Sequence, residues 1–253
     1  MLYRRCLRPA LFHLDPETAH NLLRSLSPVL SLLPRICFPR LAPHPVKLAG
    51  LTFPGPVGLA AGFDKNGDLY PFLARLGFSF IECGTFTWEK QDGNPRPRIF
   101  RYPAKQALVN RMGFNNPGAR QGRENLLRSL AGGRPVPLGI NIGKSKNASD
   151  EQAADDLRRS LEVLQDLADY LVINVSSPNT PGLRAFQSVE RMEALLSAVL
   201  PEMGKPLFVK LAPDLSTAEL AELIPVLESR VAGLILTNTS NDYSLLPDED
   251  VRE

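Results

Sequence analysis

Short apolar runs alternate with amphipathic stretches along most of the chain. The runs lie at 57–61, 80–83, 138–142, 170–175, 207–211 and 233–236, and helical patterns lie between them at 67–77, 117–130, 150–168, 188–203 and 216–229. Strands that are apolar throughout, each followed by a helix, are typical of a parallel sheet covered by helices. A (β/α) barrel and a doubly wound sheet both fit, and the absence of a G-x-G-x-x-G turn after the first run favours the barrel.

Polar side chains gather where these predicted strands end. Lys65 follows the first run, Asn141 and Asn174 lie near the ends of the third and fourth, and Lys210 lies in the fifth. Asparagine also starts turns, but turn chemistry does not explain lysines that emerge from buried strands. Both parallel architectures have their active sites at this edge. Neutral amides suit a planar heterocycle with C=O and N–H groups, whereas the lack of His and Glu argues against a hydrolytic triad or a zinc site.

The leading segment, residues 1–45, is apolar, basic and interrupted by prolines. Asp15-Pro16-Glu17 predicts a helix start, because it offers an N-cap acceptor, a proline at the first helical position and an acid near the positive end of the dipole. A second proline-started turn is expected at Pro28. Ala19, Leu22, Leu23 and Leu26 follow at helical spacing and form an apolar stripe, which Val29, Leu30 and Leu33 extend. Two interpretations stay open for this stripe, and the role of His20 stays open with them. The stripe either lies on an anionic membrane or packs on the protein's own core.

The composition narrows the classes of protein. With 253 residues, 43% hydrophobic and 22% charged, the chain is long and apolar enough to bury a core, which excludes global disorder. Three widely spaced cysteines exclude a disulfide scaffold or a cysteine-cluster metal site, and we expect no metal. The net charge of +2 gives no indication of nucleic acid binding, although residues 1–47 alone carry +5. No apolar stretch approaches the roughly 18 residues of a membrane span.

Two further stretches stand out. Residues 139–145 resemble a phosphate-binding loop, but only three residues separate the glycines instead of four, and the spacer is the predicted strand itself. Residues 86–116 contain three prolines and show no sustained period. Loops of this length in compact domains are usually functional, so we expect a folded lid.

Four motifs carry a resemblance to a known family. They are GLAAGFDKNG at 58–67, NRMGFN at 110–115, NVSSPNTPGLR at 174–184 and VKLAPD at 209–214. In motif order and spacing, from about residue 15 to the last residue, the chain resembles the quinone-dependent (class 2) dihydroorotate dehydrogenases.

The resemblance implies an FMN-containing (β/α)8 TIM barrel that oxidises (S)-dihydroorotate to orotate in de novo pyrimidine (UMP) biosynthesis. Electrons would pass to a membrane quinone, ubiquinone or menaquinone. The resemblance also implies that residues 1–45 are a helical segment that docks on an anionic membrane surface and opens a quinone tunnel. Residues 46–253 would form the barrel. The implied location is peripheral, on the cytoplasmic face of a bacterial inner membrane.

The resemblance also implies roles for individual residues. Ser177 matches the family's base, which removes a proton from substrate C5 while hydride leaves C6, although the residues alone do not separate it from Ser176. The matched FMN contacts are Ala61, Gly62, Phe63, Asp64, Lys65, Thr85, Asn141, Asn174, Lys210 and Thr237. The matched substrate contacts are Lys65, Asn110, Arg111, Met112, Gly113, Phe114, Asn174, Asn179, Asn238 and Thr239. His20 and Arg101 match positions beside the quinone tunnel.

The chain also departs from the family pattern. It offers about six of the eight strands, and the glycine-rich turns after strands seven and eight, which bind the FMN phosphate, have no counterpart. We therefore expect a C-terminally incomplete member, whose own activity stays open. Another FMN barrel reductase acting on a dihydropyrimidine is one alternative, although those enzymes use Cys where this chain has Ser177. An inactive partial barrel that binds only a membrane or a partner is the other.

Overall fold

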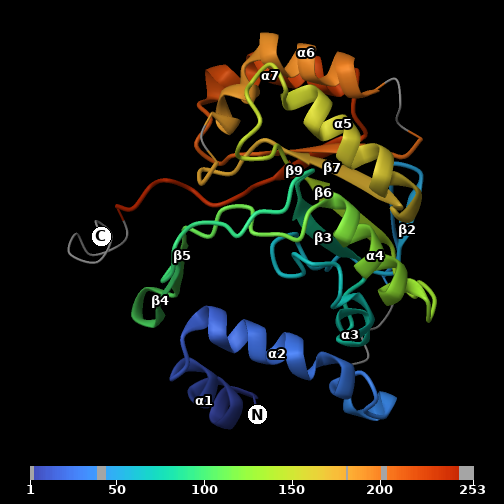
Figure 1. Cartoon of the computed structure of the whole chain (residues 1–253), viewed down its shortest axis with the longest axis vertical. Helices are drawn as coiled ribbons and strands as arrows, with labels where there is room; N and C mark the ends of the chain where they lie inside the picture. The colour runs from blue at the N-terminus through green and yellow to red at the C-terminus, as the bar shows by residue number, and fades with distance from the viewer. Residues whose placement is uncertain (1–2, 39–43, 181, 201–203, 245–253) are drawn as a thin grey trace.

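Five parallel strands form the central sheet of the protein. The structure is a computed structural model that describes residues 3–38, 44–180, 182–200 and 204–244. The strands are β3 (Ile81–Phe86), β6 (Leu138–Ile142), β7 (Tyr170–Asn174), β8 (Leu207–Leu211) and β9 (Gly233–Leu236), and they are paired in this order. Strand order thus follows chain order without the reversal of a doubly wound sheet. The sheet and its helices have the predicted (β/α)-barrel architecture (Figure 1).

Helices join the successive strands and cover one face of the sheet (Figure 1). They are α3 (Tyr70–Arg75), α4 (Ala119–Leu130), α5 (Ala153–Leu164), α6 (Val189–Val199) and α7 (Thr217–Glu228), with 3₁₀ turns η4 (Gln165–Leu167) and η5 (Leu183–Gln187). All five predicted helical patterns are confirmed. The best-capped start is that of α7, where Ser216 and Glu219 form a reciprocal capping box.

The first predicted strand, 57–61, is reduced to a single bridge. Leu59 pairs in parallel with Ile81, and its neighbours are not in a ladder. Pro56 brings no N–H to a ladder, and Gly62 turns the chain away with a φ of +106°. The prediction of a full strand here is therefore wrong, but its one bridge still holds this segment against the edge of the sheet.

The two faces of the sheet differ in character, because side chains alternate along each strand. The outer face carries Ile81, Ile140 and Ile173, which are buried beneath the helices. On the inner face, Tyr170 and Phe208 pack with Phe53 of the hairpin formed by β1 (Val46–Leu48) and β2 (Leu51–Phe53). These aromatic rings close the end of the sheet where the strands begin. The inner face at the other end is left to polar side chains.

The N-terminal helices confirm one expectation and correct another. They are η1 (Tyr3–Leu7), α1 (Arg8–Phe12), α2 (Pro16–Leu30) and η2 (Arg35–Cys37). The Asp15 side chain accepts from the N–H of Thr18 at 2.8 Å and caps α2 as predicted. Pro28, however, lies inside α2 instead of starting a new turn, because the Ser27 hydroxyl donates to the Arg24 carbonyl that Pro28 leaves without an N–H. Within the described ranges, no helix is long and apolar enough to cross a bilayer.

The long stretch after β3 contains an antiparallel hairpin. Strands β4 (Ile99–Tyr102) and β5 (Ala107–Asn110) are joined by η3 (Pro103–Lys105). The hairpin extends from the sheet toward α1 and α2 (Figure 1), and β4 contacts α2. The stretch expected to be a folded lid is thus ordered and lies beside the N-terminal helices.

Candidate functional site

A cavity of about 440 Å³ lies where the parallel strands end. The residues predicted to contact FMN that line it are Ala61, Gly62, Phe63, Lys65, Thr85, Asn174 and Lys210. The residues predicted to contact substrate that line it are Lys65, Asn110, Met112, Gly113, Phe114, Asn174, Asn179, Asn238 and Thr239. Ser177, His20 and Arg101 line it as well. Residues that are far apart in the sequence and were assigned three different roles therefore surround one space.

Three of the predicted FMN contacts do not line the cavity: Asn141, which lies in its floor, and Asp64 and Thr237, which lie away from it. The buried Asp64 carboxylate accepts from the backbone N–H groups of Gly67 at 2.8 Å and Leu69 at 3.0 Å, so it organises the turn that leads into α3. Burial raises the pKa of this carboxyl. Thr237 is exposed just beyond the end of β9. The structure gives neither side chain a place among the lining residues.

Arg111, a predicted substrate contact, lines a neighbouring cavity instead. That cavity, of about 880 Å³, lies between the end of α1 and the β4–β5 hairpin. The Arg111 guanidinium is 5.0 Å from the centre of the Phe100 ring, a cation–π distance. Arg101 lines both cavities, and its Nη1 donates to the Leu14 carbonyl at 2.9 Å. Arg101 of β4 is thus shared by the two cavities, whereas Arg111, the residue after β5, lines the 880 Å³ cavity and not the 440 Å³ one.

A network of amides forms the floor of the 440 Å³ cavity. The Thr85 hydroxyl donates to Asn141 Oδ1 at 2.6 Å, and Asn174 Nδ2 contacts the same oxygen at 3.2 Å. Asn141 is fully buried behind Thr85 and Asn174, so it supports the wall and does not line it. These three side chains come from β3, β6 and β7, which pair side by side in the sheet.

Small residues leave room for a flat ring above this floor. Gly62 has a φ of +106°, and a Cβ built there meets no protein atom within 4 Å, so a side chain would project into open space. Its N–H donates to the Gly84 carbonyl at 2.8 Å, which holds the loop against β3. With Ala61 beside it and amide groups below, this wall fits the ring system of a flavin.

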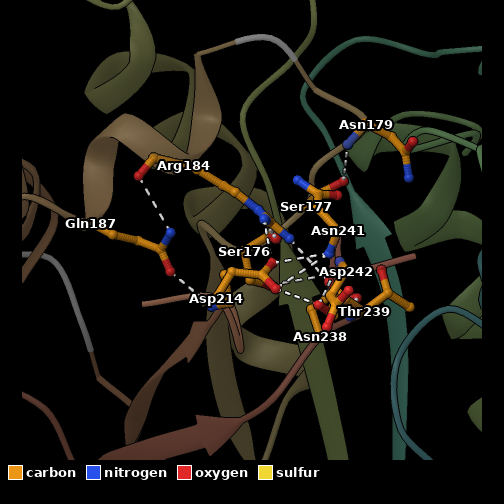
Figure 2. A network of polar contacts seen from close by, with 12 residues as sticks. Ser176, Ser177, Asn179, Arg184, Gln187, Asp214, Asn238, Thr239, Asn241 and Asp242 are labelled. Atoms are coloured by element: carbon orange, nitrogen blue, oxygen red, sulfur yellow. Dashed lines mark hydrogen bonds and ion pairs between the residues drawn. The ribbon is translucent and has the colours of Figure 1, made fainter. Parts of the chain in front are cut away.

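The two adjacent serines after β7 have different surroundings. The Ser176 hydroxyl donates to Asn174 Oδ1 at 2.7 Å and accepts from Asn238 Nδ2 at 3.0 Å, and it does not line the cavity. Ser177 lines the cavity, and its Oγ accepts from the Asn179 N–H at 3.3 Å (Figure 2). Of these two residues, only Ser177 lines the cavity.

Arg184, which no prediction singled out, joins the three loops beside these serines. Its Nε donates to the Ser176 carbonyl at 3.0 Å, and Nη2 donates to the Thr239 carbonyl at 3.0 Å. Nη1 forms an ion pair with Asp214 at 2.6 Å. Figure 2 shows the guanidinium between the loops that follow β7, β8 and β9. The signal in the sequence is only an arginine at the end of a glycine-containing motif.

Two lysines give the cavity a positive potential. Lys65 and Lys210 both line it. Burial, with the nearby cations Arg98 and Lys210, lowers the pKa of Lys65 to about 8. Since Lys65 still carries its proton at neutral pH, the site favours an anionic ligand.

The N-terminal helix α2 supplies part of the wall, which sequence reasoning found only at His20. Pro16, Glu17 and Asn21 line the cavity beside it. The imidazole of His20 meets the Phe63 ring edge-on, with centroids 4.8 Å apart, and burial lowers the pKa of His20. The first turns of α2 therefore touch the barrel at the cavity.

Comparisons with known proteins agree on one family. The family model described as dihydroorotate dehydrogenase matches residues 44–247. Similar curated proteins named dihydroorotate dehydrogenase (quinone) include one from Synechococcus sp. (strain JA-2-3B'a(2-13)), which is 48% identical over 94% of this chain and 66% of that protein. One from Deinococcus deserti is 47% identical over 94% of this chain and 70% of that protein. The chain spans about two thirds of the length of these relatives.

A solved structure agrees as well. The crystal structure of DHODH in complex with ferulenol from Eimeria tenella superposes with a TM-score of 0.82 at 37% identity. The match covers 93% of this chain and 70% of that chain.

Proposed function

The chain belongs to the dihydroorotate dehydrogenase family, and on this premise we propose that it oxidises (S)-dihydroorotate to orotate with FMN as prosthetic group. A membrane quinone, ubiquinone or menaquinone, is the final electron acceptor, and the reaction belongs to de novo pyrimidine (UMP) biosynthesis. The observation that supports this most is the cavity that Ser177 shares with two lysines and an amide floor. It combines a proton acceptor, an anion-binding group and a surface for a flat heterocycle.

Ser177 is the residue that removes a proton from C5 of the substrate. A serine hydroxyl is a weak base at its ordinary pKa, so it must pass its own proton on as it takes the new one. Its Oγ accepts from the Asn179 N–H, a contact that holds the oxygen toward the cavity and stabilises negative charge on it. Arg184 holds the backbone of the same loop through the Ser176 carbonyl.

The other polar groups bind and orient. Lys65, protonated at neutral pH, attracts the carboxylate of dihydroorotate, and Asn110, Asn179 and Asn238 offer amides to its ring. Ala61, Gly62, Thr85, Asn174 and Lys210 would hold FMN, which when bound supplies the acceptor for the hydride that leaves C6. Lys210 would stabilise negative charge on a flavin ring held beside it.

We extend the proposal to the chain's two parts. Residues 1–45 dock the protein on an anionic membrane, with His20 and Arg101 beside the quinone path, and residues 46–253 form the FMN-binding barrel. The protein then lies peripherally on the cytoplasmic face of a bacterial inner membrane. The exposed apolar side chains of α2 and η2 support this.

The test is an anaerobic visible spectrum of the purified chain before and after addition of dihydroorotate. We expect a flavin band that bleaches, and Ser177→Ala should keep FMN but slow flavin reduction about 10²–10⁴-fold. Ser176→Ala is the matched control, because its hydroxyl does not line the cavity, and it should slow reduction less.

Three results would contradict the proposal. A chain that stays colourless with added FMN does not hold the cofactor. Bleaching by dihydrouracil but not by dihydroorotate would indicate a different flavin reductase. Unchanged reduction in Ser177→Ala would mean that another residue is the base.

A further inference from the structure

Arg184 joins three loops beside the 440 Å³ cavity, although it does not line that cavity itself. Its Nε donates to the Ser176 carbonyl and its Nη2 donates to the Thr239 carbonyl, both at 3.0 Å, while Nη1 pairs with Asp214 at 2.6 Å. A guanidinium is planar and carries its N–H groups in a fixed fork. It therefore holds these three acceptors, one from each of the loops after β7, β8 and β9, at set positions relative to one another (Figure 2).

Asp214 completes this junction from the loop after β8. Its Oδ2 accepts from Arg184, and its Oδ1 accepts from the Ser240 hydroxyl. The Asn241 N–H also donates to this carboxylate, at 3.3 Å from Oδ1 and 3.2 Å from Oδ2. The side chains of Arg184 and Asp214 are 22% and 29% exposed, so salt screens the pair less than an open surface pair. One carboxylate thus orients the arginine and holds the loop after β9 beyond Thr239.

The junction grips the residue that precedes the proposed base. The Ser176 carbonyl accepts from Arg184, and the Ser176 hydroxyl accepts from Asn238 Nδ2 at 3.0 Å. The Ser177 hydroxyl itself accepts from the Asn179 N–H, two positions further along the same loop. Because that contact is local, it does not tie the loop to its neighbours. The position of the Ser177 oxygen therefore depends on how Ser176 is held.

The two loops that Arg184 joins carry different parts of the proposed chemistry. Ser177 follows β7, whereas Asn238 and Thr239 follow β9, and all three line the cavity. A base must lie within hydrogen-bond reach of the proton that it removes, and a displacement of about 1 Å can slow a reaction about 10²-fold. Arg184 thus sets the separation between the proton acceptor and two of the groups that would orient the substrate.

We propose that Arg184, oriented by Asp214, is a positioning residue that sets the reach of Ser177 to a substrate held by the loop after β9. The inference rests on the proposed function, because it takes Ser177 as the base. Arg184 acts through the backbone of Ser176 and Thr239 and touches no ligand. Its contribution is therefore to the rate of proton removal more than to the binding of dihydroorotate.

The test is anaerobic stopped-flow reduction of the FMN-loaded protein by dihydroorotate in Arg184→Lys. Lysine keeps the charge, but its single ammonium cannot serve three acceptors in a fixed fork. The rate constant at saturating dihydroorotate should fall about 10- to 100-fold. The affinity for dihydroorotate should fall less, because Lys65 and Asn110 reach the cavity from other elements. A role confined to stability changes the amplitude of the reduction and not its rate constant.

Arg123→Lys is the matched control. Arg123 also joins elements through one carboxylate and one backbone carbonyl, since Nη2 donates to Asp166 Oδ2 at 2.8 Å and Nη1 donates to the Val163 carbonyl at 2.7 Å. It lies on α4 and is not among the residues that line the cavity. The rate constant of this variant should equal that of the wild type, and equal losses in the two lysine variants would overturn the inference.

Asp214→Asn tests the same junction from its other side, and it keeps the measurement available where Arg184→Lys fails to fold. The change removes the charge that orients the guanidinium, so the rate constant should again fall. Because the two residues act through one contact, the double variant of Arg184→Lys with Asp214→Asn should be no slower than the slower single variant. Losses that add would mean that the two residues act independently, which contradicts the junction.

The remaining outcomes separate the inference from its premise. A wild-type chain whose FMN is not reduced by dihydroorotate overturns the proposed function, and the inference falls with it. A wild-type chain that is reduced, with the rate constant of Arg184→Lys equal to it, overturns the role of Arg184 alone.

Discussion

Neighbouring residues of the same type serve different purposes in this protein, and their partners show which is which. Ser176 has its hydroxyl committed to Asn174 and Asn238, whereas Ser177 turns its oxygen to the cavity. Burial and nearby cations lower the pKa of Lys65 to about 8. The few atoms around each side chain thus decide whether it supports the loop or faces the cavity, and what its pKa is.

The lowered pKa of Lys65 predicts how anion binding depends on pH. Below about pH 8 the ammonium is charged and attracts orotate, whereas above it the proton is lost and the attraction with it. Orotate affinity of the FMN-loaded protein should therefore fall by up to about tenfold per pH unit above that value. Calorimetric titrations from about pH 7 to about pH 10 measure this.

Lys65→Arg is the matched variant, because a guanidinium keeps its proton throughout this range. Its orotate affinity should be nearly flat with pH. The same fall in Lys65→Arg as in the wild type would assign the titration to a different group.

At the scale of elements, a buried ion pair joins α2 to the stretch that leads into the β4–β5 hairpin. The Glu17 carboxylate accepts from Arg98 Nη2 at 2.7 Å and from Arg96 Nη2 at 2.8 Å, and both Glu17 and Arg98 are buried. The Arg98 hydrogen bond is the largest cause that lowers the pKa of Glu17. This contact positions the N-terminal helix over the cavity.

Breaking that pair should destabilise the protein far more than breaking an exposed one. Glu17→Gln leaves the Arg98 charge buried without its partner, which costs about 3 kcal/mol of unfolding free energy. Asp68→Asn breaks the pair with Arg24, which is partly exposed, and should cost about 1 kcal/mol or less. Urea unfolding of both variants measures the difference, and equal losses would contradict the role given to Glu17.

The pH dependence follows from the same contact. Because the pKa of Glu17 is lowered in the folded state, its stabilisation is complete above the ordinary glutamate pKa. It is lost as the pH falls through the folded-state pKa, and Glu17→Gln should remove this part of the acid sensitivity.

At the scale of the whole molecule, apolar surface is concentrated at one end. Leu32 is 83% exposed and Ile36 is 86% exposed, close to the end of α2, and the first 47 residues carry a net charge of +5. Apolar side chains in a basic segment favour binding to an anionic lipid surface. The N-terminal segment thus carries both a part of the cavity wall and the exposed apolar side chains that we propose to bind lipid.

Vesicle sedimentation tests this arrangement. The double variant Leu32→Asp and Ile36→Asp should lose most of its binding to anionic vesicles, since it removes apolar area and adds negative charge. Leu127→Asp on α4 is the matched control, because Leu127 is 48% exposed but lies on the barrel, and its binding should equal that of the wild type. A similar loss in both variants would contradict docking through the N-terminal helices.

The sequence by itself determined the elements and the edge at which the site lies. Periodicity is local, so the five helices after residue 60 and the parallel strands from 80 onward could be identified without knowing their neighbours. The strand expected at 57–61 failed because Pro56 and Gly62 outweighed its apolar run. Asn174 and Lys210 were found because parallel strands bring their ends to one edge.

Only the tertiary structure decided what each polar group does there. It turned Asp64 to the turn before α3, set Asn141 behind the wall, and chose Ser177 over Ser176. Arg184 gained its role from partners as far as 55 residues away. A sequence pattern reports which face a residue is on, whereas a hydrogen bond depends on atoms a few ångströms apart that only folding brings together.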